Sequence, residues 1–340
     1  MNASLKEPKT NAKTVEKTSP IVYEFHDRNV GLHAYIVIDS DSSRYSCGGL
    51  RIAHDLTVEE VKGLARAMTY KYCFLKRATG GAKAGIVLPL DCALEQKTKI
   101  LETFGRQASF LLKNNTYNLW TDLNSCNEDI ATILKSAGCE FHGMSDSAFF
   151  TALTVVSALK AACKTKGIAL SDASVLIEGF GNVGEQIAAD LSKLGAKIVG
   201  ISTMNGSLYN RNGLDVTRLQ QLRKKYKDDL VHYYGSEFFE EKEHLLEKTA
   251  DVLIPCARAW TINATNMKNI HVKIIAPGAN IPLTQDAEEY MNQQGILVLP
   301  DFICNIGGFP IEVGFLFAGI SFLVYLYVFW KKELWNMIKR

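Results

Sequence analysis

Apolar positions recur along the chain at two spacings, and their alternation predicts strands separated by helices. Short apolar runs with the length of buried strands lie at 35–39, 85–88, 174–178, 197–202, 252–254, 273–276 and 296–299. Helices are predicted around 94–113 and 127–137, and from about Ser147 to Lys166, where Gly167 is a typical helix end. Strands and helices that alternate in this way form a parallel sheet, so the expected fold class is α/β.

A further helix is predicted from its first residues. Thr57 and Glu60 have the spacing of a capping box, in which each side chain bonds a backbone N–H of the first turn. Apolar residues three and four positions apart then form one helix face, namely Val58, Val61, Leu64, Ala65 and Met68. Gly80 and Gly81 are expected to break the chain before the strand at 85–88.

The chain has 340 residues, which is long enough for two domains. Residues 1–20 are polar and are expected to form a flexible tail. We expect the first α/β domain at 21–145 and the second, a doubly wound domain of the Rossmann type, at 146–308. An apolar helix at 309–340 is expected to follow.

That last segment is unusual because residues 313–330 carry no charge. Their length is the lower limit for a membrane span, and the following Lys331 and Lys332 would place the main body of the chain outside the cell. Nothing else in the chain resembles an exported protein, so we favour a buried or interface helix over a span and expect a cytoplasmic location. A truncated reading of a longer gene is a further explanation of this tail.

Composition narrows the function. Lys and Arg number 38 against 36 Asp and Glu, and they are scattered, so no nucleic-acid partner is expected. Hydrophobic residues make up 47% of the chain and charged residues 22%, which excludes bulk disorder. The eight cysteines form no C-x-x-C pair, and only Cys139 lies close to a histidine, His142. We therefore expect no metal site and no disulfide scaffold, but reduced thiols.

A glycine-rich loop follows directly after the strand at 174–178 and opens a helix. Its residues are Gly179, Phe180, Gly181, Asn182, Val183 and Gly184. In this strand–loop–helix setting the loop predicts a dinucleotide site, with the pyrophosphate at the helix N-terminus. Thr203 stands where an acidic residue would bind the ribose, so the cofactor is expected to be NAD or NADP.

Several short motifs stand in one order along the chain: Cys47-Gly48-Gly49-Leu50-Arg51, Met68-Thr69-Tyr70-Lys71, Gly80-Gly81-Ala82-Lys83-Ala84-Gly85, Trp120-Thr121-Asp122-Leu123, Phe150-Thr151-Ala152, Asp251 to Ala257, Pro277-Gly278-Ala279-Asn280 and Pro300 to Gly308. Together they resemble the glutamate/leucine/phenylalanine/valine dehydrogenase family, from about Val22 to Gly308. The short N-terminal part is more similar to the leucine and phenylalanine enzymes than to the longer glutamate enzymes.

The resemblance implies NAD(P)-dependent oxidative deamination of an L-amino acid to the 2-oxo acid and ammonia by a homo-oligomer. The first domain is then the substrate-binding and dimerisation domain. Catalytic roles fall on Lys83 and Asp122. Substrate binding falls on Lys71, Gly48 and Gly49. Beyond the glycine loop and Thr203, the residues expected to contact the cofactor are Thr151, Ala257 and Asn280.

The chemistry explains these residue types, although a lone lysine is usually a solvated surface charge. A lysine acts as a base only when its pKa falls toward neutrality, and burial, a second lysine and the nicotinamide ring would all lower the pKa of Lys83. Gly80, Gly81 and Gly85 are expected to allow close approach of the substrate. Lys71 would bind the α-carboxylate, and Asp122 would pass protons to and from the amino group.

Departures from the family limit these expectations. Cys47 stands where glutamate enzymes of the family carry a lysine, so an aliphatic or aromatic amino acid is expected in preference to glutamate. Thr154, Glu312 and the apolar tail are also atypical. Thr203, Glu312 and the altered end keep open a second reading, in which the chain is a catalytically silent dinucleotide-binding relative with a regulatory or scaffold role. In a third reading, residues 313–330 tether the chain to a membrane.

Overall fold

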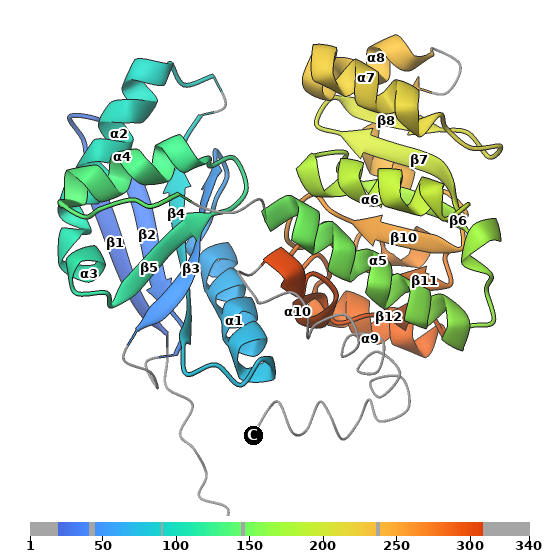
Figure 1. Ribbon diagram of the computed structural model, residues 1–340, viewed down its shortest axis with the longest axis horizontal. Coiled ribbons are helices and arrows are strands. Elements are labelled where there is room, and N and C mark those ends of the chain that lie inside the picture. Colours follow the sequence, from blue (N-terminus) through green and yellow to red (C-terminus); the bar gives the residue numbers. More distant parts are fainter. Residues whose placement is uncertain (1–19, 41–44, 90, 144–146, 236–238, 309–340) are drawn as a thin grey trace, which may run out of the picture.

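The computed structural model describes residues 20–40, 45–89, 91–143, 147–235 and 239–308. Two α/β domains lie side by side, each built on its own sheet (Figure 1). The expected tail at 1–20 lies outside the described residues except for Pro20, and the expected boundary between 145 and 146 falls within the undescribed 144–146. The apolar segment at 313–330 and Glu312 are also outside them.

The first sheet has five strands in the order β1-β2-β4-β3-β5. They are β1 (Ile21–Asp27), β2 (Leu32–Ile38), β3 (Ser46–Ala53), β4 (Gly80–Val87) and β5 (Tyr117–Thr121). One face packs on α2 (Leu94–Gln107), α3 (Ser109–Lys113) and α4 (Asn127–Ala137). The other face packs on α1 (Val58–Phe74), which lies on the side toward the second domain (Figure 1).

The second sheet has seven strands in the order β12-β11-β10-β6-β7-β8-β9. They are β6 (Ser174–Glu178), β7 (Lys197–Thr203), β8 (Gly206–Tyr209), β9 (Phe239–Glu240), β10 (Val252–Pro255), β11 (Ile274–Ile275) and β12 (Leu297–Val298). The strands from β12 to β7 run parallel, which confirms the doubly wound fold, and β8 and β9 extend the edge in antiparallel fashion. The helices of this domain are α5 (Ser147–Thr165), α6 (Asn182–Lys193), α7 (Val216–Tyr226), α8 (Leu230–Tyr234), α9 (Gln285–Gln293) and α10 (Asp301–Cys304).

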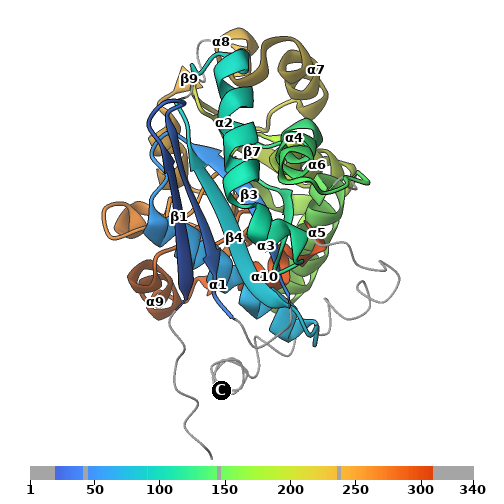
Figure 2. The same cartoon turned by 90° about the vertical axis from the view of Figure 1, so that its left-hand side faces the viewer.

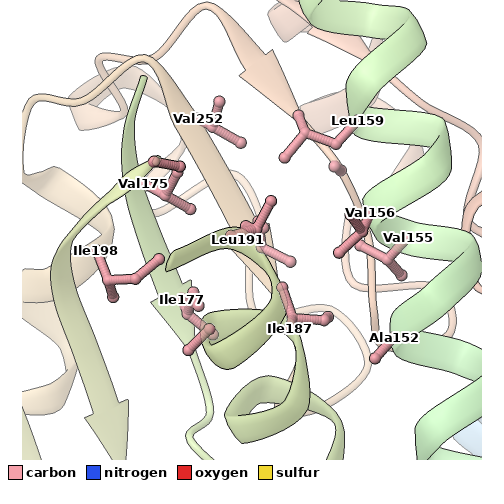
Figure 3. Close-up of a cluster of buried hydrophobic side chains, with 14 of the residues drawn as sticks. Ala152, Val155, Val156, Leu159, Val175, Ile177, Ile187, Leu191, Ile198 and Val252 are labelled. Carbon is pink, nitrogen blue, oxygen red and sulfur yellow. The ribbon is translucent and has the colours of Figure 1, made fainter. Parts of the chain in front are cut away.

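The core of the second domain explains why α5 is so apolar. Figure 3 shows Ala152, Val155, Val156 and Leu159 of α5 directed toward α6 and the sheet, where all four are buried. Within the described part of the chain, α5 is the one helix long and apolar enough to cross a membrane, and half of it is buried in the protein. Its apolar face is therefore accounted for by this core.

Several local expectations were wrong for identifiable reasons. Gly80 and Gly81 do not break the chain but begin β4. Glycine is needed at position 81 because α1 packs so closely there that a Cβ would lie 2.2 Å from the backbone N of Thr69. The helix expected over 94–113 is two helices with Ala108 between them. Only half of the capping box forms: Thr57 accepts a bond from the N–H of Glu60, whose carboxylate is engaged elsewhere.

Candidate active site

A buried ion-pair cluster joins β4 and β3 to the end of β5 in the first sheet. Lys83 of β4 is 2% exposed, and its Nζ lies 2.9 Å from Oδ2 of Asp122, which directly follows β5. Arg51 of β3 donates from Nε to the same oxygen at 3.0 Å. Because β3 lies between β4 and β5, strand order brings these three side chains together. The sequence-predicted pair of Lys83 and Asp122 is thus in direct contact.

The cluster shifts the pKa values of its members. Burial alone would raise the pKa of Asp122, but the positive charges of Lys83 and Arg51 outweigh it, and the pKa of this carboxyl is lowered. Burial lowers the pKa of Lys83, and Arg51 lowers it further, against the opposing effect of Asp122. Among the cations, the largest effect on the pKa of Lys83 comes from Arg51, a residue to which sequence reasoning gave no role.

The ion pairs continue from this cluster into the second domain. Arg51 Nη1 donates to Glu60 Oε1 of α1 at 2.7 Å. Arg258, which follows β10, donates to Glu60 Oε2 at 3.2 Å and to both carboxylate oxygens of Asp55 at 2.7 and 2.8 Å. A continuous chain of charges therefore joins the second domain to Asp122. Only Asp122 of this chain of charges was predicted as a site residue from the sequence. The contacts of Arg258 join positions 198 to 203 residues apart, so no local sequence pattern reveals them.

Lys71 also forms a contact between the two domains, in addition to the ion pairs of Arg258. Its Nζ donates to Oδ1 of Asn280 at 2.7 Å, so the sequence-predicted substrate residue and cofactor residue meet across the boundary. Burial lowers the pKa of Lys71 to about 8; the nearby Asp301 opposes this effect and the charge of Lys83 adds to it. Lys71 and Lys83 are therefore close enough to influence each other's charge.

Asn305 completes this corner and was not predicted as a site residue. Its Nδ2 donates to Asn280 Oδ1 at 3.0 Å and to the carbonyl oxygen of Ala279 at 2.9 Å. Its Oδ1 is buried, and within the described residues it has no hydrogen-bond partner. A buried acceptor without a donor is costly, so this oxygen marks a position where a bound N–H group would be stabilised.

The glycine loop has the geometry of a phosphate cradle. Gly179 has φ +88°, and a Cβ on it would lie 2.9 Å from Cα of Ala257, so Ala257 closes one side of the turn. A Cβ at Gly184 would lie 2.1 Å from the carbonyl oxygen of Gly179, whereas a Cβ at Gly181 would meet nothing within 4 Å. The open space at Gly181 and the N-terminus of α6 fit a pyrophosphate.

Arg223 of α7 adds a positive charge beside this cradle. Its Nη2 donates to Oδ1 of Asn182 at 2.8 Å, and its Nη1 pairs with Glu185, so it lies against the first turn of α6. Arg223 is 41 residues from Asn182 in the sequence, which is why no motif contained it. The side chain of Asn182 is committed to this contact.

The hydroxyls of Thr203 and Thr151 are both used inside the protein. Thr203 donates to the carbonyl oxygen of Asp228 at 2.7 Å and accepts from the backbone N–H of Asn205. Thr151 donates to the carbonyl oxygen of Ser147 within α5 at 2.7 Å. Each hydroxyl therefore donates its proton within the protein and could contact a cofactor only as an acceptor, and the two cofactor contacts stay predictions.

The predicted substrate glycines serve strand packing. A Cβ at Gly48 would lie 1.7 Å from the carbonyl oxygen of Ala82, and a Cβ at Gly49 would lie 2.5 Å from that of Thr121. A Cβ at Gly85 would lie 2.4 Å from the side chain of Leu56, so this glycine also makes room for another part of the protein. These glycines let β3, β4, β5 and α1 pack closely enough to bring Lys83 and Asp122 together.

Cys47 lies in the same layer of the sheet and remains neutral. It is 7% exposed, and burial raises the pKa of its thiol to about 11, although contacts with Tyr72 and Trp120 oppose the shift. Cys47 therefore places a neutral thiol beside Tyr72 and Trp120, where the charge of Lys83 also acts on it.

The fold and this site define a two-domain α/β protein with a dinucleotide cradle in one domain and buried lysines in the other. Comparison of the sequence with known protein families identifies the family of this protein. The dimerisation domain of the Glu/Leu/Phe/Val dehydrogenases matches residues 19–136, and the Glutamate/Leucine/Phenylalanine/Valine dehydrogenase domain matches residues 143–312. The chain belongs to this family.

The relatives found are glutamate dehydrogenases. The catabolic NAD-specific glutamate dehydrogenase of Bacillus subtilis is 31% identical over 281 residues, which cover 78% of this chain and 66% of that protein. The NADP-specific glutamate dehydrogenase of Saccharolobus shibatae is 30% identical over 277 residues, covering 77% and 65%. This chain therefore spans about two thirds of the length of these relatives.

Solved structures share the fold. The hetero-hexameric glutamate dehydrogenase from Thermus thermophilus, in its Leu-bound form, superposes with a TM-score of 0.73 at 22% identity, over 91% of this chain and 76% of that one. Plasmodium falciparum glutamate dehydrogenase gives 0.70 at 20% identity, over 92% and 72%. At this identity the likeness establishes the two-domain architecture.

Proposed function

We propose that this chain catalyses the NAD(P)-dependent oxidative deamination of an L-amino acid to the 2-oxo acid and ammonia. The observation that carries the proposal is the buried pair of Lys83 and Asp122, in which the pKa of the lysine is lowered. A lowered pKa favours the neutral amine, which is the form of a lysine that can act as a base. Lys71 lies nearby, at the boundary with the dinucleotide-binding domain.

The residues of the second domain fit a nicotinamide dinucleotide. The open space at Gly181 and the N–H groups at the start of α6 would hold the pyrophosphate, and the nearby Arg223 is already paired with Glu185. The buried acceptor of Asn305 would receive an N–H donor such as a carboxamide. When bound, the nicotinamide supplies the acceptor for the hydride that leaves the substrate. The relatives include one NAD-specific and one NADP-specific enzyme, so we retain both cofactors in the proposal.

The first domain supplies the groups that act on the substrate. Lys71 would bind the α-carboxylate, which requires that its present partner, Asn280, share or release the ammonium group. Neutral Lys83 would remove a proton from the water that attacks the imine carbon left after oxidation. As Lys83 gains this proton, Asp122 stabilises the positive charge at 2.9 Å.

Asp122 is ionised in the structure, and this restricts its role. Its lowered pKa makes it a weak proton acceptor while both Lys83 and Arg51 are charged. Once Lys83 is neutral, one of the two cations is lost, and the pKa of Asp122 rises toward values at which it can exchange protons with the amino group. The two groups therefore titrate as a coupled pair.

Two observations favour different side chains on the substrate. The relatives reported above are all glutamate dehydrogenases, so they support glutamate and give the expected aliphatic or aromatic preference no support. The neutral thiol of Cys47 favours an uncharged side chain, because it lacks the cation that would pair with a second carboxylate. We therefore propose an L-amino acid as the substrate, and the assay of several amino acids described below identifies which one.

We also propose that the chain assembles into a homo-oligomer. One of the similar structures is a hetero-hexamer, and residues 19–136 match a dimerisation domain. Cytoplasmic localisation remains an expectation. The alternative of a catalytically silent relative is favoured by Thr203, which stands in place of an acidic ribose ligand and whose hydroxyl donates its proton to the carbonyl oxygen of Asp228.

The test is the formation of reduced nicotinamide by the purified full chain. A panel of L-amino acids that includes glutamate, leucine and phenylalanine is assayed with NAD and with NADP at mildly alkaline pH. Turnover with any of them supports the proposal and identifies the substrate and cofactor together. Binding of the dinucleotide without turnover on any amino acid would instead favour the silent relative.

A further inference from the structure

The hairpin of β1 and β2 carries a group of metal-binding side chains away from the catalytic residues. The strands are antiparallel, with His26 directly opposite His33 and Glu24 directly opposite Tyr35. Residues two apart on a strand share a face, so these four side chains form a block on one side of the hairpin. β1 is the edge strand of its sheet, and Figure 2 shows the hairpin at the outside of the molecule.

The distances within this group match those between ligands of one metal ion. Nε2 of His26 lies 2.9 Å from Oε1 of Glu24, and Nε2 of His33 lies 3.2 Å from the same oxygen. The ligand atoms of the three residues all lie within 4.8 Å of one another. Two ligands of a tetrahedral Zn²⁺, each about 2.0–2.2 Å from the metal, are roughly 3.3 Å apart.

We propose that Glu24, His26 and His33 bind one divalent transition-metal cation of the Zn²⁺ class. Two imidazoles and one carboxylate are a ligand set that such ions accept, whereas Mg²⁺ and Ca²⁺ prefer oxygen ligands throughout. Three protein ligands leave a fourth position of a tetrahedral site open to water. Nothing in the deamination chemistry uses these residues, so the site is independent of the proposed function.

The strand pairing holds the ligands in place before the metal arrives. The rings of His26 and His33 are stacked with centroids 4.4 Å apart and an interplanar angle of 25°. Tyr35, which is buried, places its hydroxyl 2.6 Å from Nε2 of His33. Metal binding at Nε2 replaces this bond and leaves the hydroxyl beside the cation.

The test compares Zn²⁺ binding by the untagged full-length protein and its variants, measured by isothermal titration calorimetry after removal of metal with a chelator. The wild type is expected to bind one equivalent that His26→Ala/His33→Ala loses and that Glu24→Gln binds more weakly. The matched control is His142→Ala, which removes an exposed histidine that also lies beside a glutamate, Glu140, but has no second histidine. This control is expected to bind as the wild type does.

Two results would overturn the inference. The first is equal Zn²⁺ binding by the wild type and the double variant. The second is a Co²⁺ complex of the wild type whose absorption spectrum shows thiolate charge transfer, because that would place the metal on cysteines. Circular dichroism without metal checks that the variants fold. Since these side chains are partly exposed, their replacement is expected to leave the fold unchanged.

Discussion

The two glycines of the cradle allow the structure and the proposed ligand to be tested separately. A Cβ at Gly184 would lie 2.1 Å from the carbonyl oxygen of Gly179 and 3.2 Å from Cγ2 of Ile177, so Gly184→Ala forces the turn and helix α6 apart. A Cβ at Gly181 would meet nothing within 4 Å, so Gly181→Ala is tolerated by the unliganded protein. A methyl group should therefore lower the stability of the protein at position 184 and the affinity for the dinucleotide at position 181.

The magnitudes follow from these contacts. Overpacking of this kind costs about 1–3 kcal/mol, and a domain of this size loses roughly 2–4 °C in Tm per kcal/mol, so Gly184→Ala should lower Tm by roughly 2–12 °C. Gly181→Ala should change the free energy of unfolding by less than about 0.5 kcal/mol. It should nevertheless weaken dinucleotide binding about 10- to 150-fold, the equivalent of one charge-assisted hydrogen bond of about 1.5–3 kcal/mol.

The assays are thermal unfolding without ligand and fluorescence titration with NADH and NADPH. The reasoning predicts a loss of stability in Gly184→Ala and a loss of affinity, with unchanged Tm, in Gly181→Ala. It would be refuted if Gly181→Ala bound both dinucleotides as tightly as the wild type. It would also be refuted if the two variants lost stability equally.

Three further predictions concern the charged residues and the pocket. Arg258→Met removes the ion pairs that join the second domain to Asp55 and Glu60, while the contact of Lys71 with Asn280 remains. The kcat should fall at least several-fold while Tm changes little, and an unchanged kcat would show that these ion pairs do not act on the site. Asp122→Asn leaves the buried charge of Lys83 without its carboxylate partner and removes one of the two carboxylates that pair with Arg51, which should cost about 3–5 kcal/mol in urea unfolding at pH 7. Because the folded protein lowers the pKa of Asp122, its contribution is complete above the unfolded value of about 3.9 and is lost as pH falls below it. Stability measured across acidic pH should therefore fall less steeply in the variant, and equal slopes would refute the assignment. Cys47→Lys should raise kcat/KM for glutamate relative to leucine, and an unchanged ratio would remove Cys47 from the specificity pocket.

Local sequence signals predicted the second domain well. The strand at 174–178, the glycine loop and the following helix lie within one continuous stretch, so periodicity and turn chemistry are sufficient to recognise them. The first domain was harder, because β3 contains Gly48 and Gly49 and lacks the pattern of a strand. Gly80 and Gly81 were misread as a break in the chain, because the need for glycine at Gly81 comes from α1, which packs on it in three dimensions.

The candidate site was predictable only as far as motifs reach. Lys83 and Asp122 were predicted from their motifs, and the structure places them in contact. Arg51 stands in one of the motifs but received no role, because nothing in the sequence shows that β3 lies between β4 and β5. Arg258 and Arg223 act on residues far away in the sequence, and only the packing of the domains and helices reveals them.

The central claim is that Lys83 is the base of an amino-acid dehydrogenase. The most direct measurement compares wild type with Lys83→Ala, recording reduced nicotinamide formed on the best amino acid and, in parallel, the Kd for the dinucleotide. We expect Lys83→Ala to abolish turnover while dinucleotide binding stays nearly intact. Wild-type turnover in Lys83→Ala would contradict it.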